Sequence, residues 1–246
     1  MKEEKQNQVG LPENAFRPLK AGEEYRPLMS PDKEYPEVNL WSVSWGIAMA
    51  ILFSAAAAYL GLKVGQVFEA AIPIAIIAVG VSSAAKRKGA LGENVIIQSI
   101  GACSGVIVAG AIFTLPALFL WAAEGKMDKP GIIEITLIAL LGGLLGVFFM
   151  VPLRNALIVK EHGVLPYPEG TACAEVLLAG EEGGANATTV FAGMGFAAIF
   201  KFIIDGLKAV PGEITFAVKG YAGAIGTQIY PAVMSVGYIC GPRISS

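Results

Sequence analysis

Long uncharged stretches separated by short polar ones dominate the pattern of hydrophobic and polar residues along this chain. The first stretch runs from Leu40 to Leu60, about the length that a helix needs to cross the hydrocarbon core of a bilayer. Trp41, Trp45 and Tyr59 lie towards its ends, where aromatic side chains favour the membrane interface. We therefore expect a first membrane-spanning helix here.

Further apolar runs follow along the chain. The strongly apolar ones lie at residues 66–85, 94–121 and 132–151. The run at 94–121 contains Pro116 and is longer than one core thickness, so it should tilt or kink. Two less firm spans lie at residues 188–204 and 221–239. The pattern predicts an all-α integral membrane protein, a polytopic helical bundle with about five to six spans.

A more polar element separates the fourth run from the fifth. A charged linker that contains His162 leads into LPYPEGTACAEVLLAG at residues 165–180, which is too short and too polar for an ordinary span. Pro168 suits the first position of a helix, and Glu169 would then lie in the first turn. We expect a partly inserted element after the fourth span, either re-entrant or a broken helix.

Residues 1–38 differ from the rest of the chain in composition. They mix both charge signs with several prolines and cannot bury enough apolar surface to order themselves. We therefore expect a disordered cytoplasmic tail over residues 1–38 and a transmembrane region over residues 39–246.

Basic residues set the expected orientation of a membrane protein. On one side fall the tail, residues 86–88, Arg154 and Lys160, and on the other Lys63, Lys126 and Lys129. The richer side should be cytoplasmic. This predicts a multi-pass protein of the inner (cytoplasmic) membrane with its N-terminus inside the cell.

Composition narrows the class of function. Hydrophobic residues make up 54% of the chain and charged residues only 15%, which is unlike a soluble domain. The net charge of -2 and the lack of a nucleic-acid motif argue against a nucleic-acid partner. The three cysteines are far apart, and no GxSxG, HExxH or Walker-type loop is present. We expect no metal site, no cofactor and no enzymatic activity.

Acidic residues in or near the apolar runs are candidates for proton coupling. Glu69 lies near the start of the second run, and an ionisable group at membrane depth suggests a function, whereas at the interface it would need none. Glu169 could receive a proton or pair with the cationic end of a zwitterion. Thr171 and Glu175 share one face of the expected helix, and Glu175 is a third acidic candidate. The alternative for this segment is a capped surface loop.

His162 is the single histidine of the chain. Histidine can change its charge within the physiological pH range, which makes His162 a further candidate for proton coupling. The alternative is an ordinary solvated histidine in the polar linker.

Several stretches, taken in order, resemble the oligopeptide transporter (OPT) family, and most closely its prokaryotic branch, which is related to the yellow-stripe-like carriers of metal chelates. They are AAAAYLGLKVGQVFEAAIPIAI (55–76), GENVIIQSIGACSGVIVAGAIFTLPAL (92–118), LPYPEGTACAEVL (165–177) and GYICGPR (237–243). The resemblance covers roughly residue 35 to the C-terminus. Because family members are longer, it implies that this chain is the N-terminal part of a longer transporter.

The resemblance implies proton-coupled import of small oligopeptides by alternating access, with the lipid bilayer, a small peptide and protons as partners. Because PYPEG matches a family signature, it implies that Tyr167, Pro168, Glu169, Gly170 and Thr171 lie on the substrate path. Two alternatives stay open. The cargo could be a metal-chelate complex, or the chain could be a truncated, non-transporting membrane subunit. The missing C-terminal part of the transporter would be a further partner.

Overall fold

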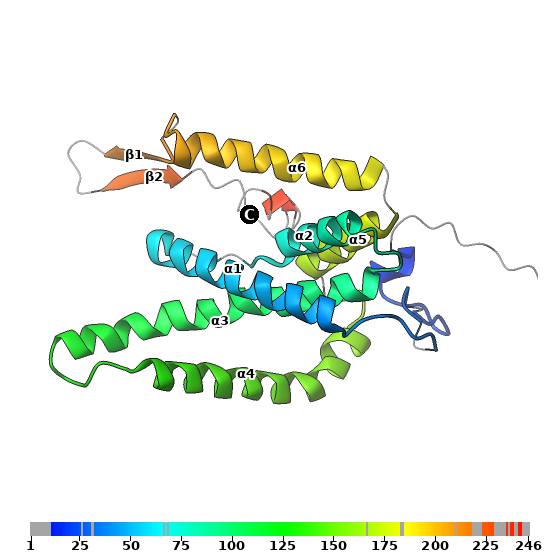
Figure 1. The fold of residues 1–246 in the computed structure, drawn as a ribbon, viewed down its shortest axis with the longest axis horizontal. Coiled ribbons are helices and arrows are strands. Elements are labelled where there is room, and N and C mark those ends of the chain that lie inside the picture. Colours follow the sequence, from blue (N-terminus) through cyan, green and yellow to red (C-terminus); the bar gives the residue numbers. More distant parts are fainter. Residues whose placement is uncertain are drawn as a thin grey trace, which may run out of the picture.

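A bundle of apolar helices forms most of the protein in the computed structural model (Figure 1). The structure describes residues 11–242 except 26, 31, 66, 68, 166, 183–184, 210, 218–222, 229–234, 236 and 239–240. Within this part, three helices are long and apolar enough to cross a membrane. They are α1 (Leu40–Val64), α3 (Leu91–Ala123) and α4 (Ile132–Arg154), the last continued by a π-helical turn over Asn155–Lys160. The predicted all-α polytopic membrane fold is confirmed.

Shorter α-helices accompany these spans in the described part of the chain. They are α2 (Ala71–Ala84), α5 (Pro168–Glu182) and α6 (Ala185–Lys201), with a π-helical turn, Phe202–Gly206, after α6. Two apolar stretches among them, Ala71–Ala84 and Phe191–Ile204, are shorter than the long spans. Helix α5 begins at Pro168, where the sequence predicted a helix start.

The last expected span is not helical where the structure describes its middle. Strands β1 (Glu213–Ala217) and β2 (Ala224–Gln228) pair antiparallel, with Glu213 opposite Gln228 and Ala217 opposite Ala224. The prediction of a helix through residues 224–228 is therefore wrong. Ile225, Gly226 and Thr227 favour helix weakly, and their backbone pairs with β1 in the extended form instead. Most of the remaining residues of the run 221–239 lie outside the described part.

The start of α1 is set by its own side chains. The Asn39 side chain accepts a hydrogen bond from the Ser42 backbone N–H at 2.9 Å, and the Ser42 hydroxyl accepts one from the Asn39 N–H at 3.0 Å. This reciprocal capping satisfies backbone donors that the first helical turn leaves free. It explains why the helix begins at the residue where the charge-free stretch begins.

Helix α1 packs along α3, and α2 packs between α3 and α5. One core joins α1, α2 and α3 through Met49, Ile74 and Ile97. Gly101 lets these helices approach, since a Cβ added there would lie 2.9 Å from Ile74 Cδ1. Helix α4 differs, because none of its residues is buried and a Cβ added at Gly142 would meet no neighbouring side chain or helix within 4 Å. A groove of about 610 Å³ with apolar walls separates α4 from α3.

Helices α2 and α5 lie side by side and extend along only part of the length of α3 (Figure 1). Ala75, Val79 and Leu177 form a second core between them. The approach is closest at Gly180, where an added Cβ would lie 2.3 Å from Val79 Cγ1. The partly inserted element predicted after the fourth span is thus a short helix held against another short helix.

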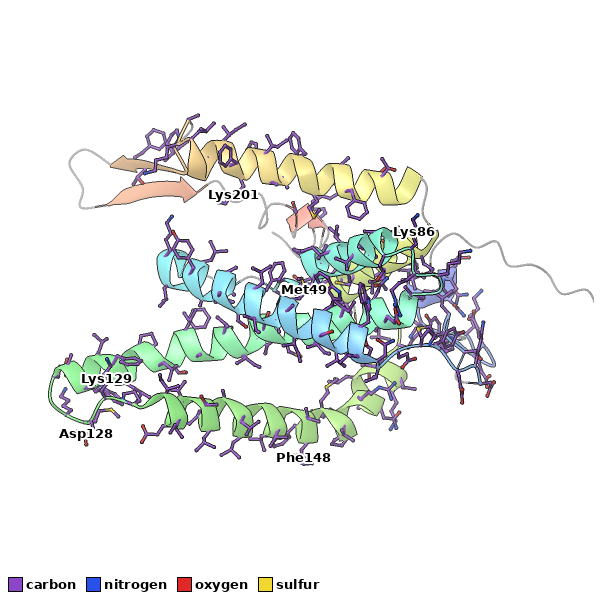
Figure 2. The ribbon with its side chains drawn as sticks, in the orientation of Figure 1. Met49, Lys86, Asp128, Lys129, Phe148 and Lys201 are labelled. Carbon is purple, nitrogen blue, oxygen red and sulfur yellow. The ribbon has the colours of Figure 1, made fainter. Side chains whose placement is uncertain are left out.

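The two ends of the bundle carry different segments. Lys86, in the turn between α2 and α3, lies at the end that also holds the start of α1 and the end of α4, whereas Asp128 and Lys129 lie at the other end (Figure 2). The residues that the sequence grouped on its richer basic side therefore come from segments at one end of the bundle.

Replacing Gly180 with alanine should destabilise the protein by about 1–3 kcal/mol, because the added methyl group overlaps Val79. Gly142→Ala is the matched control, since it makes the same change in a helix with free space around the residue. Thermal unfolding in detergent, followed by the loss of monodisperse protein, measures both. Equal midpoints for the two variants would contradict the close α2–α5 contact.

Candidate functional site

Two carboxylates come together where α2 and α5 begin. Glu69 lies in the turn between α1 and α2, and Glu169 lies in the first turn of α5. The two side chains interact through a carboxyl–carboxyl hydrogen bond and through their charges. We call Glu69 and Glu169 the carboxylate pair. The sequence predicted each as a proton-coupling candidate, and the fold brings them to one place from positions that are far apart in the chain.

The surroundings of the carboxylate pair favour protonation. Partial burial raises the pKa of Glu69, and the charge of Glu169 and its hydrogen bond raise it further, although part of the Glu69 side chain stays exposed. One turn beyond Glu169 lies Cys173, which is buried. Burial, then the charges of Glu169 and Glu69, raise the pKa of the Cys173 thiol to about 11. The thiol therefore stays protonated and behaves as a packing group.

A cavity of about 500 Å³ lies on another face of α5. Its walls include Tyr167, Pro168, Thr171 and Glu175 from the start of α5, and His162 from the preceding linker. We call it the α5 pocket. The Tyr167 hydroxyl donates a hydrogen bond to the Leu157 carbonyl at 3.0 Å, which ties the pocket to the turn after α4. Gly170 and Glu169 do not line this cavity.

The predicted site residues are therefore split between two faces of one helix. Glu169 and Cys173, four residues apart, face the side of Glu69, while Thr171 and Glu175, also four apart, face the α5 pocket. His162 lies with the pocket: its Nε2 is 2.8 Å from the Asn14 carbonyl oxygen, and its ring lies 5.0 Å from that of Tyr25. Within the described residues, no three His, Cys, Asp or Glu side chains are placed to hold a metal ion.

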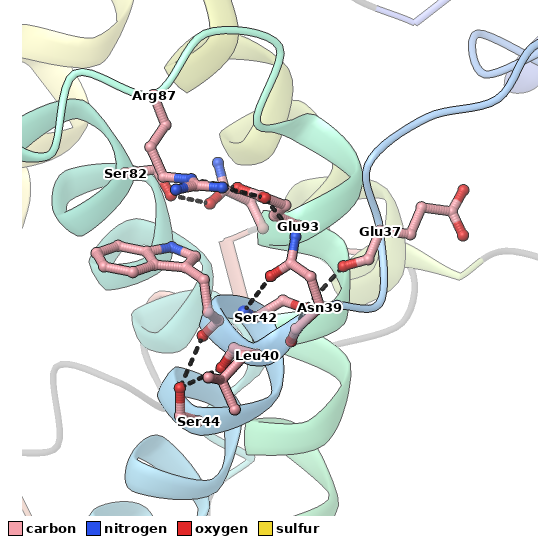
Figure 3. Close-up of polar contacts among 10 residues, drawn as sticks. Glu37, Asn39, Leu40, Ser42, Ser44, Ser82, Arg87 and Glu93 are labelled. Atoms are coloured by element: carbon pink, nitrogen blue, oxygen red, sulfur yellow. Dashed lines mark hydrogen bonds and ion pairs between the residues drawn. The ribbon is translucent and has the colours of Figure 1, made fainter.

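A second polar cluster, which the sequence analysis missed, lies near the start of α3 (Figure 3). Arg87 Nε donates to Glu93 Oε2 at 2.6 Å, Arg87 Nη2 donates to Glu93 Oε1 at 2.5 Å, and Asn39 Nδ2 donates to the same Oε1 at 2.5 Å. We call Arg87, Glu93 and Asn39 the clasp. The Glu93 side chain is only 2% exposed, and Arg87 also lies over the Trp41 ring at 5.1 Å.

The clasp joins the start of α1 to the turn between α2 and α3. The sequence analysis assigned no partner to Glu93, although Arg87 is only six residues away. The signal that could have found this pair is a basic residue at the end of one apolar run facing an acidic residue at the start of the next. Asn39 could not have been found in this way, because it lies 54 residues from Glu93.

Comparison with known proteins shows the family to which the chain belongs. Residues 37–246 match the family model described as OPT oligopeptide transporter protein. This chain belongs to the oligopeptide transporter family. A Haemophilus influenzae protein named "Putative oligopeptide transporter" is 34% identical over 189 residues, which cover 74% of this chain and 28% of that protein. The chain therefore matches little more than a quarter of the length of this relative. No solved structure matches this chain.

The family match includes α2, α5 and the turn that contains Glu69. It also includes the clasp and most of the α5 pocket. The part of that pocket formed by residues 15 and 16 lies before the matched region. The resemblance that the sequence showed to the oligopeptide transporter family is confirmed.

Breaking the clasp should be costly. Arg87→Ala leaves a buried carboxylate without its cation, and we expect a loss of about 3 kcal/mol in stability. Arg87→Ala combined with Glu93→Gln should recover part of this loss, because no buried charge is left. The control is Lys126→Ala, which removes an exposed pair with Glu124 and should cost about 1 kcal/mol at most. If the single and double variants unfold at the same temperature, the buried charge is not the cause.

The carboxylate pair should make stability depend on pH. The pKa of Glu69 is raised in the folded state, so its contribution is complete below the pKa of the unfolded chain and is lost as the pH rises through the folded value. The unfolding midpoint of the wild type, relative to that of Glu69→Gln, should rise as the pH falls from about 7 to about 5. Glu181→Gln, an exposed position near the other end of α5, should follow the wild type. Parallel curves for wild type and Glu69→Gln would show that Glu69 does not titrate in this range.

Proposed function

We propose that this chain supplies the proton-binding group and part of the substrate path of a secondary transporter that imports small oligopeptides with protons. The observation that carries the proposal is the carboxylate pair at the starts of two short, packed helices. The family of the chain supports the substrate class. On this proposal the protein lies in the inner membrane with its N-terminus in the cytoplasm. The basic segments gathered at one end of the bundle support that orientation.

The first step is proton capture. Two carboxyl groups in contact do not both ionise readily, so the carboxylate pair holds one proton more strongly than an isolated carboxyl group would. Glu69 would be the group that holds this proton, because burial and the nearby Glu169 raise its pKa. Glu169 lies in the first turn of α5, where the helix dipole partly stabilises its negative charge after the proton leaves.

The second step links the proton to movement. Glu69 and Glu169 belong to different elements, so any relative shift of α2 and α5 separates the two carboxyl groups. Separation lowers the affinity for the proton, because the neighbouring charge is then farther away. An alternating-access transition that moves one short helix against the other would therefore release the proton on one side of the membrane only. This makes the carboxylate pair a coupling device and not only a titratable group.

The third step concerns the peptide. The α5 pocket has a volume of about 500 Å³, which suits a small ligand. Glu175 offers a carboxylate to a peptide amino group, while Tyr167 and Thr171 offer hydroxyls on the same wall. Because α5 carries the pocket on one face and Glu169 on another, binding of a peptide and protonation act on one rigid element. Metal chelates are the alternative cargo, and uptake of each labelled cargo decides between the two.

Uptake of labelled small peptides into proteoliposomes tests the proposal, with and without an inward proton gradient. The proteoliposomes should contain the complete transporter that includes this sequence. We expect gradient-stimulated uptake in the wild type, and in Glu69→Gln and Glu169→Gln a fall to the level without a gradient. Glu181→Gln is the control and should keep the stimulation. Unchanged stimulation in the double variant Glu69→Gln/Glu169→Gln would contradict the assignment. Uptake of labelled ferric or nickel chelates, with no uptake of labelled peptides, would identify the other cargo.

A further inference from the structure

The N-terminal segment, residues 11–25, lies against the mouth of the α5 pocket. Ala15 and Phe16 form part of the pocket wall, opposite residues from the start of α5. The Asn14 carbonyl oxygen is 2.8 Å from His162 Nε2, and the Tyr25 ring lies 5.0 Å from the His162 ring. Figure 1 shows this part of the chain, in dark blue, at the end of the bundle where α5 lies. These contacts belong to the segment that the sequence analysis predicted to be a disordered tail.

The backbone of the segment also touches the linker before α5. Gly163 has a φ of +69°, and a Cβ added there would lie 2.1 Å from the Arg17 carbonyl carbon and 2.4 Å from the Pro18 nitrogen. No other residue type leaves room for this contact, so Gly163 is needed both for its own conformation and for the approach of the segment. His162 and Gly163 together form the surface on which the segment rests.

The segment keeps its shape through an internal ion pair. Arg17 Nη1 and Nη2 each donate to a Glu23 carboxylate oxygen at 2.8 Å, and the Lys20 backbone N–H donates to Glu23 at 3.0 Å. The hydrogen bonds from Arg17, and then that from Lys20, lower the pKa of Glu23 to about 2. Glu23 therefore stays charged at every physiological pH. The loop that presents Asn14 and Phe16 to the pocket is thus a defined structure.

One contact of the segment uses a chemical group that every peptide carries. The His162 ring donates from Nε2 to a backbone carbonyl, a group present in every peptide. Ala15 and Phe16, which follow Asn14, form part of the pocket wall. We propose that the N-terminal segment is an internal pseudosubstrate: it covers the α5 pocket, His162 binds its backbone carbonyl, and it must leave before a transported peptide can bind His162 in the same way. The inference rests on the proposed function in assigning the pocket to peptides.

The experiment measures access to the α5 pocket without measuring transport. Thr171, on the pocket wall, is replaced with cysteine in a protein whose Cys103, Cys173 and Cys240 are replaced with alanine. The rate of reaction with a water-soluble maleimide then reports how open the pocket is. Removal of residues 1–25 should raise this rate about tenfold. An unchanged rate of maleimide reaction after the removal would contradict the proposal that the segment covers the α5 pocket.

Gly163→Ala should open the pocket by a second route, which keeps the segment in the chain but displaces it from residue 163. The added methyl group has no room beside Arg17, so we expect a rise in the maleimide rate similar to that after truncation. Gly125→Ala is the matched control, because Gly125 also has a positive φ (+72°) but no atom within 4 Å of the added Cβ. An increase in the control as large as in Gly163→Ala would show that backbone strain, and not loss of the cover, opens the pocket.

The role of His162 is tested in the truncated protein. A synthetic peptide with the sequence of residues 11–18, LPENAFRP, should slow the labelling of Thr171→Cys, and His162→Ala should remove most of this protection. Protection that does not depend on His162 would contradict its role in binding the carbonyl. If truncation opens the pocket and the peptide protects it, yet the complete transporter takes up no peptide, the segment still covers the pocket through His162, and the transport proposal fails.

Discussion

Helix α5 lies against α2 at a distance that Gly180 makes possible, and the approach of Glu169 to Glu69 follows from this contact. Val79 of α2 fills the space that a side chain at residue 180 would need. Leu177, one turn earlier, enters the core with Ala75 and Val79. The same face of α5, continued towards its start, carries Cys173 and Glu169. The packing that holds the end of the helix thereby directs Glu169 towards Glu69 at the start of α2.

One short helix therefore serves two sites. Its residues at intervals of three or four face α2 and the carboxylate pair, and a second set at the same intervals faces the α5 pocket. If the proposed function holds, this rigid element carries the proton-binding group on one side and the ligand pocket on the other, and a force on either face moves both. The hydrogen bond from Tyr167 to Leu157 extends this connection to the turn after α4.

The clasp and the N-terminal segment both lie outside the apolar middle of the bundle, and both involve residues before α1. The clasp holds Asn39 to Glu93, and the segment rests on His162 and Gly163. Charged and polar groups can be satisfied there by one another, whereas in the middle of the bundle each unpaired group would be costly. Glu69 lies in the turn before α2, and partial burial together with the nearby Glu169 raises its pKa.

The sequence by itself determined the class of the protein, the long spans and the start of α5. Runs of apolar residues over about twenty positions require helices in a membrane, and a proline followed by an acidic residue marks a helix start, so these features depend on local chemistry alone. It also singled out Glu69 and Glu169, because charge is rare in such a chain. The strand at residues 224–228 was not foreseen, since an apolar run has no periodicity that separates strand from helix.

Only the tertiary structure decided which of these residues meet. Glu69 and Glu169 are a hundred positions apart, and nothing in the local pattern shows that α5 folds back on α2. The same holds for Asn39 with Glu93, and for Asn14 with His162. Hydrophobic patterning indicates which face of a helix is buried. It does not indicate which element packs against that face, because the hydrophobic effect is non-directional. The partners are chosen by the fit of particular surfaces, as at Gly101, Gly163 and Gly180, where the lack of a side chain admits one neighbour and no bulkier residue could.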